Sequence, residues 1–81
     1  MKKQFIVKES NVKRREEFYK YVLNNYNLFA EFDKDYMINS IFPFVVDFKN
    51  KNFWVCESIT CCACAAQNNQ IIAIDEFKER I

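Results

Sequence analysis

The sequence predicts one small α+β domain, in which a single-layer antiparallel sheet is packed by helices. The chain has 81 residues, which is the length of one domain. Its apolar share of 51%, against 28% charged residues, is typical of a folded protein and not of a disordered one. Short β-prone runs alternate with helical segments, and together they predict the order β-α-β-β-α-β.

The first half of the chain predicts a strand and then a long helix. Residues 4–8 (QFIVK) form a short β-prone run that ends in a polar cluster. Residues 11–26 contain neither Pro nor Gly and repeat apolar side chains at helical spacing, so we expect an amphipathic helix with Ser10 or Asn11 as its N-cap. Residues 27–40 mix helical and turn signals, which predicts a mixed connection.

A β-hairpin is the next predicted element. Residues 42–48 (FPFVVDF) and 53–57 (FWVCE) alternate their side chains between two faces. Residues 49–52 (KNKN) lie between them and predict a polar turn, because its two asparagines tolerate positive φ. Pro43 cannot donate a ladder hydrogen bond, so it belongs at the start of the strand or on an edge.

The C-terminal part predicts a short helix, a strand and a last helical segment. Small residues at 60–67 indicate the short helix, with Ser58 or Thr60 as its cap. The run IIAI at 71–74 indicates a buried strand, and Asp75 is expected to cap one or two final helical turns. The complete order matches the split βαβ arrangement of ferredoxin-like domains, and a related α/β roll is the alternative.

Two residue types are absent from the sequence, and their absence excludes most familiar enzyme motifs. Without His there is no Ser-His-Asp or Cys-His nucleophile activation and no imidazole proton shuttle. Without Gly there is no phosphate-binding P-loop, dinucleotide fingerprint or nucleophile elbow. We therefore expect a protein that is not an enzyme and that uses no cofactor.

The charge of the chain is small but unevenly distributed. The net charge is +1, which gives no global field for holding nucleic acid or anionic lipid. Residues 1–20 contain seven basic and three acidic residues, a net of +4, and residues 21–81 contain five and eight, a net of −3. This distribution predicts either two opposite patches that steer a protein partner or ordinary solvated faces.

Four cysteines form the most distinctive chemical feature: Cys56, Cys61, Cys62 and Cys64. They could bind zinc, but structural zinc sites usually use two well-separated pairs, and adjacent helical side chains diverge by about 100°. A C-x-x-C pair at a helix start could serve redox chemistry, although the glycine of thioredoxin-like motifs is missing. The favoured interpretation is packing, because reduced cysteine behaves as a compact apolar group.

One set of candidate binding residues lies in the first turns of the predicted long helix. Lys13, Arg14 and Arg15, together with Tyr19, are suited to contacting phosphates or a charged partner. The alternative is that these mixed charges form a solvated face.

A second set of candidates comes from the hairpin and the segment after it. Trp54 could take part in base stacking or in a partner site, although the neighbouring Asp47 and Glu57 argue against nucleic acid. Ser58 and Thr60 lie at the expected start of the short helix, where free N–H groups can hold a phosphate or carboxylate.

Glu31, Asp33 and Asp35 form an acidic patch that lacks the spacing of a calcium loop, so a solvated loop is favoured there.

No stretch approaches the roughly 20 apolar residues of a membrane helix. The start, MKKQFIVKESN, contains no signal-peptide core. We therefore expect a cytosolic protein with reduced thiols and no membrane partner.

The whole chain resembles the small accessory proteins of bacteriophages and mobile elements. The points of likeness are the lysine-led first strand, the hairpin FPFVVDFKNKNFWV, the small-residue segment SITCCACAAQ and the closing I-x-I-D-E-F-K. In size and character it is similar to anti-CRISPR and other anti-defence inhibitors. This resemblance implies a non-enzymatic inhibitor that binds and blocks a host defence protein of the CRISPR-Cas-like type in the host cytoplasm.

Two other functions stay open at this stage. The first is a homodimer or larger oligomer that sequesters a nucleotide immune signal. The second is a cysteine-based redox or zinc module. The resemblance supplies no functional residues, and the residue types do not select a target.

Overall fold

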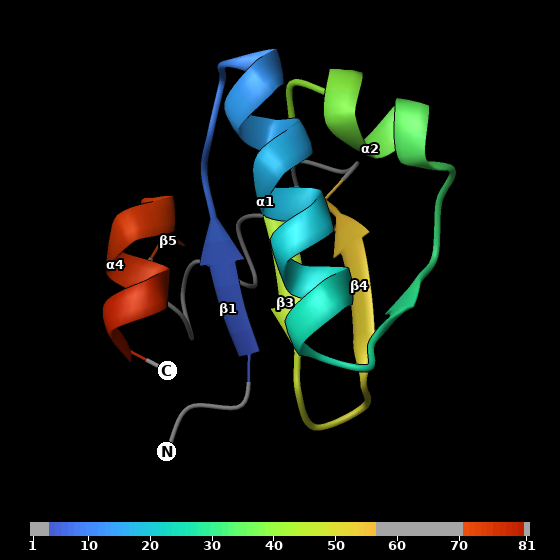
Figure 1. The fold of residues 1–81 in the computed structure, drawn as a ribbon, viewed down its shortest axis with the longest axis vertical. Coiled ribbons are helices and arrows are strands. Elements are labelled where there is room, and N and C mark those ends of the chain that lie inside the picture. The colour runs from blue at the N-terminus through green and yellow to red at the C-terminus, as the bar shows by residue number, and fades with distance from the viewer. Residues whose placement is uncertain (1–3, 57–70, 81) are drawn as a thin grey trace.

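A mixed sheet of five strands forms the centre of the protein (Figure 1). The computed structural model describes residues 4–56 and 71–80. Within these residues the strand order is β2-β4-β3-β1-β5. The strands are β1 (Gln4–Val7), β2 (Phe29–Ala30), β3 (Phe44–Asp47), β4 (Asn52–Val55) and β5 (Ile71–Ile72), and the helices are α1 (Val12–Asn25), α2 (Lys34–Asn39) and α4 (Ile74–Arg80).

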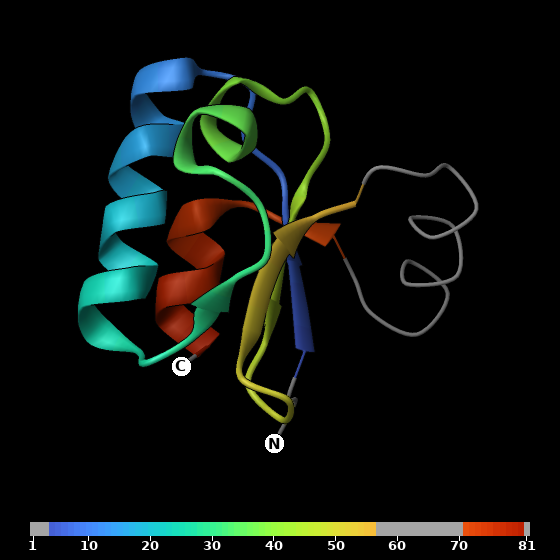
Figure 2. The same ribbon diagram turned by 90° about the vertical axis from the view of Figure 1, so that its right-hand side faces the viewer.

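The helices α1, α2 and α4 all lie on the same face of the sheet (Figure 2). We call this the helix side and the other the opposite face. None of the helices in the described parts of the chain is long and apolar enough to cross a membrane.

The predicted α+β class is confirmed, but the predicted antiparallel sheet is wrong. β1 pairs with β3, and β3 with β4, in antiparallel fashion, whereas β1–β5 and β2–β4 are parallel pairs. α1 connects β1 to β2, the strand at one edge of the sheet in the described residues. The described order also contains β2 and α2, which the predicted order β-α-β-β-α-β lacks.

The long helix begins and ends within one residue of its predicted bounds. The side chain of Asn11 caps α1, because its Oδ1 accepts a hydrogen bond from the Arg14 N–H at 3.1 Å. The helix ends at Asn25, and the backbone of Tyr26 is extended. The predicted N-cap is therefore confirmed, with Asn11 and not Ser10 in that role.

The predicted mixed connection at 27–40 contains the short strand β2 and the helix α2. Two hydrogen bonds hold β2 beside β4: the Phe29 N–H donates to the Lys51 carbonyl at 2.8 Å, and the Glu31 N–H donates to the Phe53 carbonyl at 3.0 Å. A two-residue strand is too short to show alternation, which explains why the sequence pattern did not reveal it.

The predicted hairpin is confirmed, but its strands are Phe44–Asp47 and Asn52–Val55 and not 42–48 and 53–57. Val45 lies opposite Trp54, and Pro43 precedes the first strand, where its carbonyl accepts from the Cys56 N–H at 3.0 Å. The turn covers residues 48–51 and not 49–52, and Lys51, with φ of 58°, takes the left-handed conformation in place of an asparagine. Asp47 stabilises this turn, since its Oδ1 accepts from the Lys49 N–H at 3.0 Å.

The C-terminal elements differ from prediction at their boundary. The predicted strand 71–74 ends at Ile72, and α4 begins at Ile74, so Asp75 lies within the first turn of the helix and does not cap it. The predicted helix 60–67 lies outside the described residues. α4 then buries Phe77 completely against the sheet.

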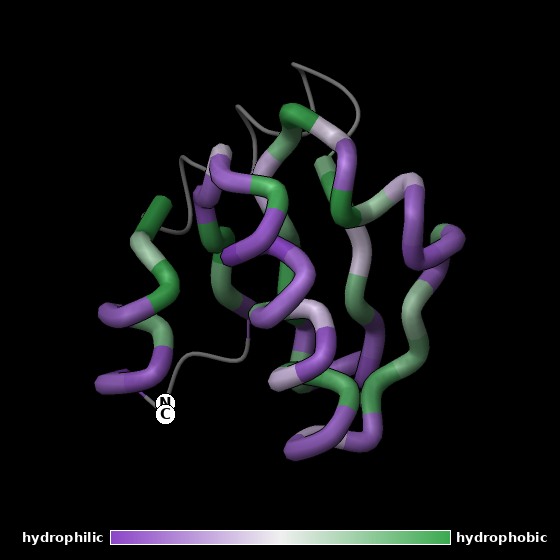
Figure 3. Tube along the Cα trace, turned by 45° about the horizontal axis from the view of Figure 1, so that its top comes forward, coloured by the Kyte–Doolittle hydropathy of each residue, from purple (hydrophilic) through white to green (hydrophobic). Residues whose placement is uncertain are grey.

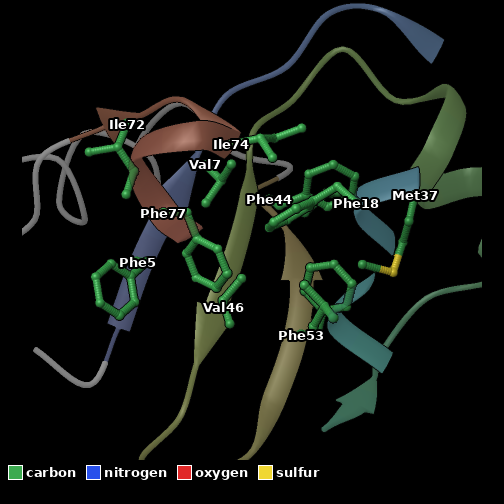
Figure 4. Packing of buried hydrophobic residues seen from close by; sticks show 12 residues of the cluster. Phe5, Val7, Phe18, Met37, Phe44, Val46, Phe53, Ile72, Ile74 and Phe77 are labelled. Atoms are coloured by element: carbon green, nitrogen blue, oxygen red, sulfur yellow. The ribbon is translucent and has the colours of Figure 1, made fainter. Parts of the chain in front are cut away.

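Phenylalanine rings fill the core between the sheet and the helices (Figure 4). Phe18 of α1 lies 5.3 Å from both Phe44 of β3 and Phe77 of α4, measured between ring centroids. Phe44 in turn stacks on Phe53 of β4 at 5.3 Å. Figure 3 shows the pattern behind this core: α1 is hydrophilic along most of its length, and its hydrophobic residues recur at intervals.

Candidate functional site

The predicted binding residues do not come together in one site. Lys13, Arg14, Arg15 and Tyr19 belong to α1 on the helix side, whereas Trp54 belongs to β4. The remaining two candidates, Ser58 and Thr60, lie outside the described residues. The α1 residues and Trp54 therefore have to be considered separately.

Arg15 is buried, with 1% of its surface exposed, and so is not on the protein surface. Its guanidinium donates to three backbone carbonyls: Nε to Ile38 at 2.8 Å, Nη1 to Glu9 at 2.7 Å and Nη2 to Met37 at 2.6 Å. It also lies 4.1 Å from the ring centroid of Phe44. Arg15 is therefore a structural residue, and its expected role in contacting a ligand does not agree with its position.

The sequence contained a signal for this burial. Arg15, Phe18 and Val22 are spaced i, i+3 and i+7, and all three lie on the buried side of α1. Met37 and Ile38 belong to the last turn of α2, where carbonyls lack helical partners and favour a nearby cation. Burial lowers the pKa of Arg15, and the nearby charge of Glu9 opposes this shift.

Arg14 lies on the surface and joins two parts of the chain. Its guanidinium is 3.5 Å from the Glu9 carboxylate and 3.7 Å from that of Asp75 in α4. Glu9 also accepts a hydrogen bond from the Asn11 N–H at 3.0 Å. The charge of Arg14 is thus partly neutralised by its neighbours, which makes it a weaker candidate for binding an anion.

Lys13 and Tyr19 complete the α1 set. Lys13 is exposed, whereas Tyr19 is half-buried, with its ring centroid 5.9 Å from that of Phe53. Tyr19 therefore belongs to the margin of the core, and Lys13 is the member of this set with the most accessible charge.

Trp54 belongs to an apolar row on the opposite face of the sheet. The register places Trp54 beside Val45, Val45 beside Ile6, and Ile6 beside Ile71. Their sequence neighbours pack in the helix-side core, so alternation points these four side chains the other way. Ile6 and Val45 are buried, Trp54 is half-buried and Ile71 is exposed. Trp54 is therefore the accessible aromatic of this row.

The predicted cysteine cluster is described only at Cys56, whose side chain is buried. Cys61, Cys62 and Cys64 lie outside the described residues. Among residues 4–56 and 71–80, no group of three or more potential ligands could hold a metal ion.

A tyrosine pair lies where α1 ends near α4. The rings of Tyr21 and Tyr26 are 6.1 Å apart, and Lys78 Nζ lies 4.6 Å from the centroid of the Tyr21 ring. Burial raises the pKa of Tyr26 to about 12, and a hydrogen bond with Tyr21 adds to this shift. At neutral pH the Tyr26 phenol stays protonated and serves as a packing group.

The exposed apolar side chains concentrate in one segment that the sequence did not single out. We call residues 29–41 the β2–α2 segment, which follows one side of the molecule in Figure 1. Of the five large hydrophobic residues exposed in the described regions, three belong to it: Phe29 at 68%, Tyr36 at 42% and Ile41 at 90%. Phe32 supports Tyr36 at a centroid distance of 5.3 Å.

The sequence feature that indicates this surface is the mixture of aromatic and acidic residues in the run EFDKDY at 31–36. An isolated aromatic side chain in a polar run has no periodic apolar neighbours, so it is free to face solvent. The sequence favours a solvated loop for the carboxylates of this run; all three are exposed, but Asp35 belongs to α2 and not to a loop. The expectation did not include the aromatic rings beside them.

The fold and surfaces define a small α+β protein with a mixed sheet and an exposed aromatic segment at one side. No family model matched the chain, and neither curated proteins nor solved structures yielded a match. The resemblance to phage accessory proteins therefore stays a prediction.

Proposed function

We propose that the protein is a non-enzymatic inhibitor, of the kind that phages and mobile elements encode, which binds and blocks a host defence protein of the CRISPR-Cas-like type. The observation that supports this proposal is the concentration of exposed aromatic and aliphatic side chains in the β2–α2 segment. Such a concentration is typical of protein–protein interaction sites.

Phe29 and Tyr36 are suitable anchors for such an interface. Aromatic side chains often dominate binding energy when a partner buries them completely. Full burial of a side chain of the size of Phe29 contributes about 1.5–3 kcal/mol. Since 68% of Phe29 is still exposed, most of this energy is available to a partner.

The frame that presents these anchors is held by specific contacts. Arg15 donates to the Met37 and Ile38 carbonyls of α2, and Lys34 lies 3.8 Å from the Glu16 carboxylate of α1. β2 is fixed to β4 by its two backbone hydrogen bonds. Binding to a pre-organised surface loses less conformational entropy, so a small protein of this kind can still bind tightly.

A phage plating assay tests the proposal. The protein is expressed in a bacterial host whose CRISPR-Cas system targets the infecting phage, and the assay is repeated with hosts of different system types. We expect the protein to restore plating in one of them. Plating that stays suppressed in every system would contradict the proposed target class.

Two variants connect this result to the β2–α2 segment. The double variant Phe29→Ser/Tyr36→Ser removes both anchors, and we expect it to lose inhibition. Val12→Ser is the matched control, because Val12 is also half-exposed but lies at the start of α1. Equal inhibition by the double variant and the control would place the interface elsewhere.

A titration with the purified defence complex separates binding from catalysis. Stoichiometric inhibition predicts that target activity falls in proportion to the added protein and ends near equimolar amounts. Complete inhibition at a small fraction of the target concentration would show turnover and would refute a non-enzymatic mechanism.

A further inference from the structure

The residues that lead into α2, together with its first turn, combine a half-buried ring and an exposed ring with three carboxylates. Phe32 and Tyr36 lie 5.3 Å apart between ring centroids, and the side chain of Tyr36 is 42% exposed. Glu31, Asp33 and Asp35 are exposed on either side of them. We call these five residues the acidic α2 face.

The negative charge of this face is not balanced by nearby cations. Lys34 is the one basic residue in the run 31–36, and its Nζ lies 3.8 Å from the Glu16 carboxylate of α1. In the part of the chain that the structure describes, Glu31, Asp33 and Asp35 form no salt bridge, whereas Glu16 of α1 and Asp75 and Glu76 of α4 do. A partner with positive charge would therefore complement this face.

Arginine is the residue whose chemistry fits both components of the face. Its guanidinium forms paired hydrogen bonds with a carboxylate and also stacks on an aromatic ring. Lysine offers only a strongly hydrated point charge, which matches the carboxylates but has no planar group to stack on a ring. Tyr36 and Phe32 thus favour arginine over lysine.

We propose that the acidic α2 face binds an arginine-rich segment of the partner protein. The proposal rests on the proposed function, since it names the chemistry of the surface that the inhibitor covers. Nucleic acid does not fit, because its phosphates would face unneutralised carboxylates. A second copy of this chain and a lysine-rich partner are outcomes that the experiment distinguishes.

The test is a titration of the ¹⁵N-labelled protein with a short poly-arginine peptide, followed by NMR. We expect amide shifts concentrated at residues 31–36 and an affinity that falls as salt rises. A poly-lysine peptide of equal length should bind several-fold more weakly. Equal affinity for both peptides would overturn the selection of arginine by the rings.

Substitutions provide the second arm of the test. Asp33→Asn with Asp35→Asn removes two charges and should weaken peptide binding about fivefold. The N-cap position of Asp33 tolerates asparagine, so α2 should still form. Tyr36→Ala should weaken binding about threefold and reduce the preference for arginine. Glu79→Gln, at an exposed position of α4, is the matched control and should change nothing.

Three further results would overturn the proposal. Shifts of equal size at the acidic residues of α4 would show non-specific charge pairing. Self-association of the free protein through residues 31–36 would show that a second copy is the occupant. Restored phage plating without peptide binding would refute this inference and leave the proposed function intact. Peptide binding without restored plating would refute the proposed function and leave this inference intact.

Discussion

Replacing Arg15 by methionine tests the most consequential contact in the core. Arg15→Met keeps an unbranched side chain of similar length but removes all three hydrogen bonds to the carbonyls of Glu9, Met37 and Ile38. It also removes the cation–π contact with Phe44. The carbonyls of Met37 and Ile38 are buried, so water cannot easily replace the lost donors.

The expected cost follows from these contacts. Each buried carbonyl left without a donor costs about 1–3 kcal/mol, so the two together cost about 2–6 kcal/mol. The Glu9 carbonyl is only partly buried and can be hydrated. Because the variant no longer buries a charge, the desolvation penalty of the guanidinium disappears, and this offsets part of the destabilisation. We expect a net loss near 3 kcal/mol, against a total stability of about 4–12 kcal/mol for a chain of this length.

Urea unfolding monitored by the fluorescence of Trp54, the single tryptophan, measures this loss. Arg14→Met is the matched control, because the Arg14 side chain is 51% exposed and its ion pairs lie at the surface. The control should lose less than about 1 kcal/mol. Equal midpoint shifts for the two variants would refute the structural role of Arg15.

Three further changes test the phenol, the turn and the core. Burial raises the pKa of Tyr26 to about 12, so the contribution of its protonated phenol to folding stability is complete below pH 10 and is lost as the pH rises toward 12. Ultraviolet titration should show one phenol that ionises near pH 12, and Tyr26→Phe should remove this transition. Lys51→Gly relieves a positive φ and should add about 0.5–1 kcal/mol in urea unfolding, whereas Lys49→Gly should add nothing. Phe18→Ala should cost about 3–5 kcal/mol in the same assay, and a cost below 1 kcal/mol would show that the aromatic cluster collapses around the gap.

Local patterns predicted the elements whose determinants are close together in the sequence. The hairpin follows from alternating side chains around a polar turn, and the structure pairs its two strands with Val45 opposite Trp54. α1 follows from helical spacing and from a cap at Asn11. In both cases a few neighbouring residues contain the necessary information, because turns and caps are local structures.

The direction of the strands could not be predicted in the same way. Whether β5 runs parallel or antiparallel to β1 depends on how the chain returns to the sheet, and the two residues Ile71 and Ile72 contain no pattern that decides it. The end of β5 was also placed too late, because Ile74 is apolar in either a strand or a helix. Short apolar runs leave this ambiguity in general.

The functional prediction failed at Arg15 for a different reason. The charges of Lys13, Arg14 and Arg15 alone predict one basic surface. Helical spacing, however, places Arg15 on the buried side of α1 with Phe18, whereas Lys13 and Arg14 face solvent. Conversely, Tyr36 is exposed, but the polar run in which it lies contains no apolar pattern that would indicate this. In both cases the position of the side chain on its element, and not its type, decides whether it can meet a partner.

These two residues are connected through α2. A helix of six residues does not form by itself in water, so the tertiary contacts of Arg15 and Lys34 keep it in place. Losing Arg15 would therefore weaken binding by displacing the surface that contains Tyr36, without Arg15 touching the partner. For this reason reduced binding by an Arg15 variant is no evidence for a basic interface on α1, and only substitutions of the exposed side chains themselves, at Phe29 or Tyr36, can locate the site.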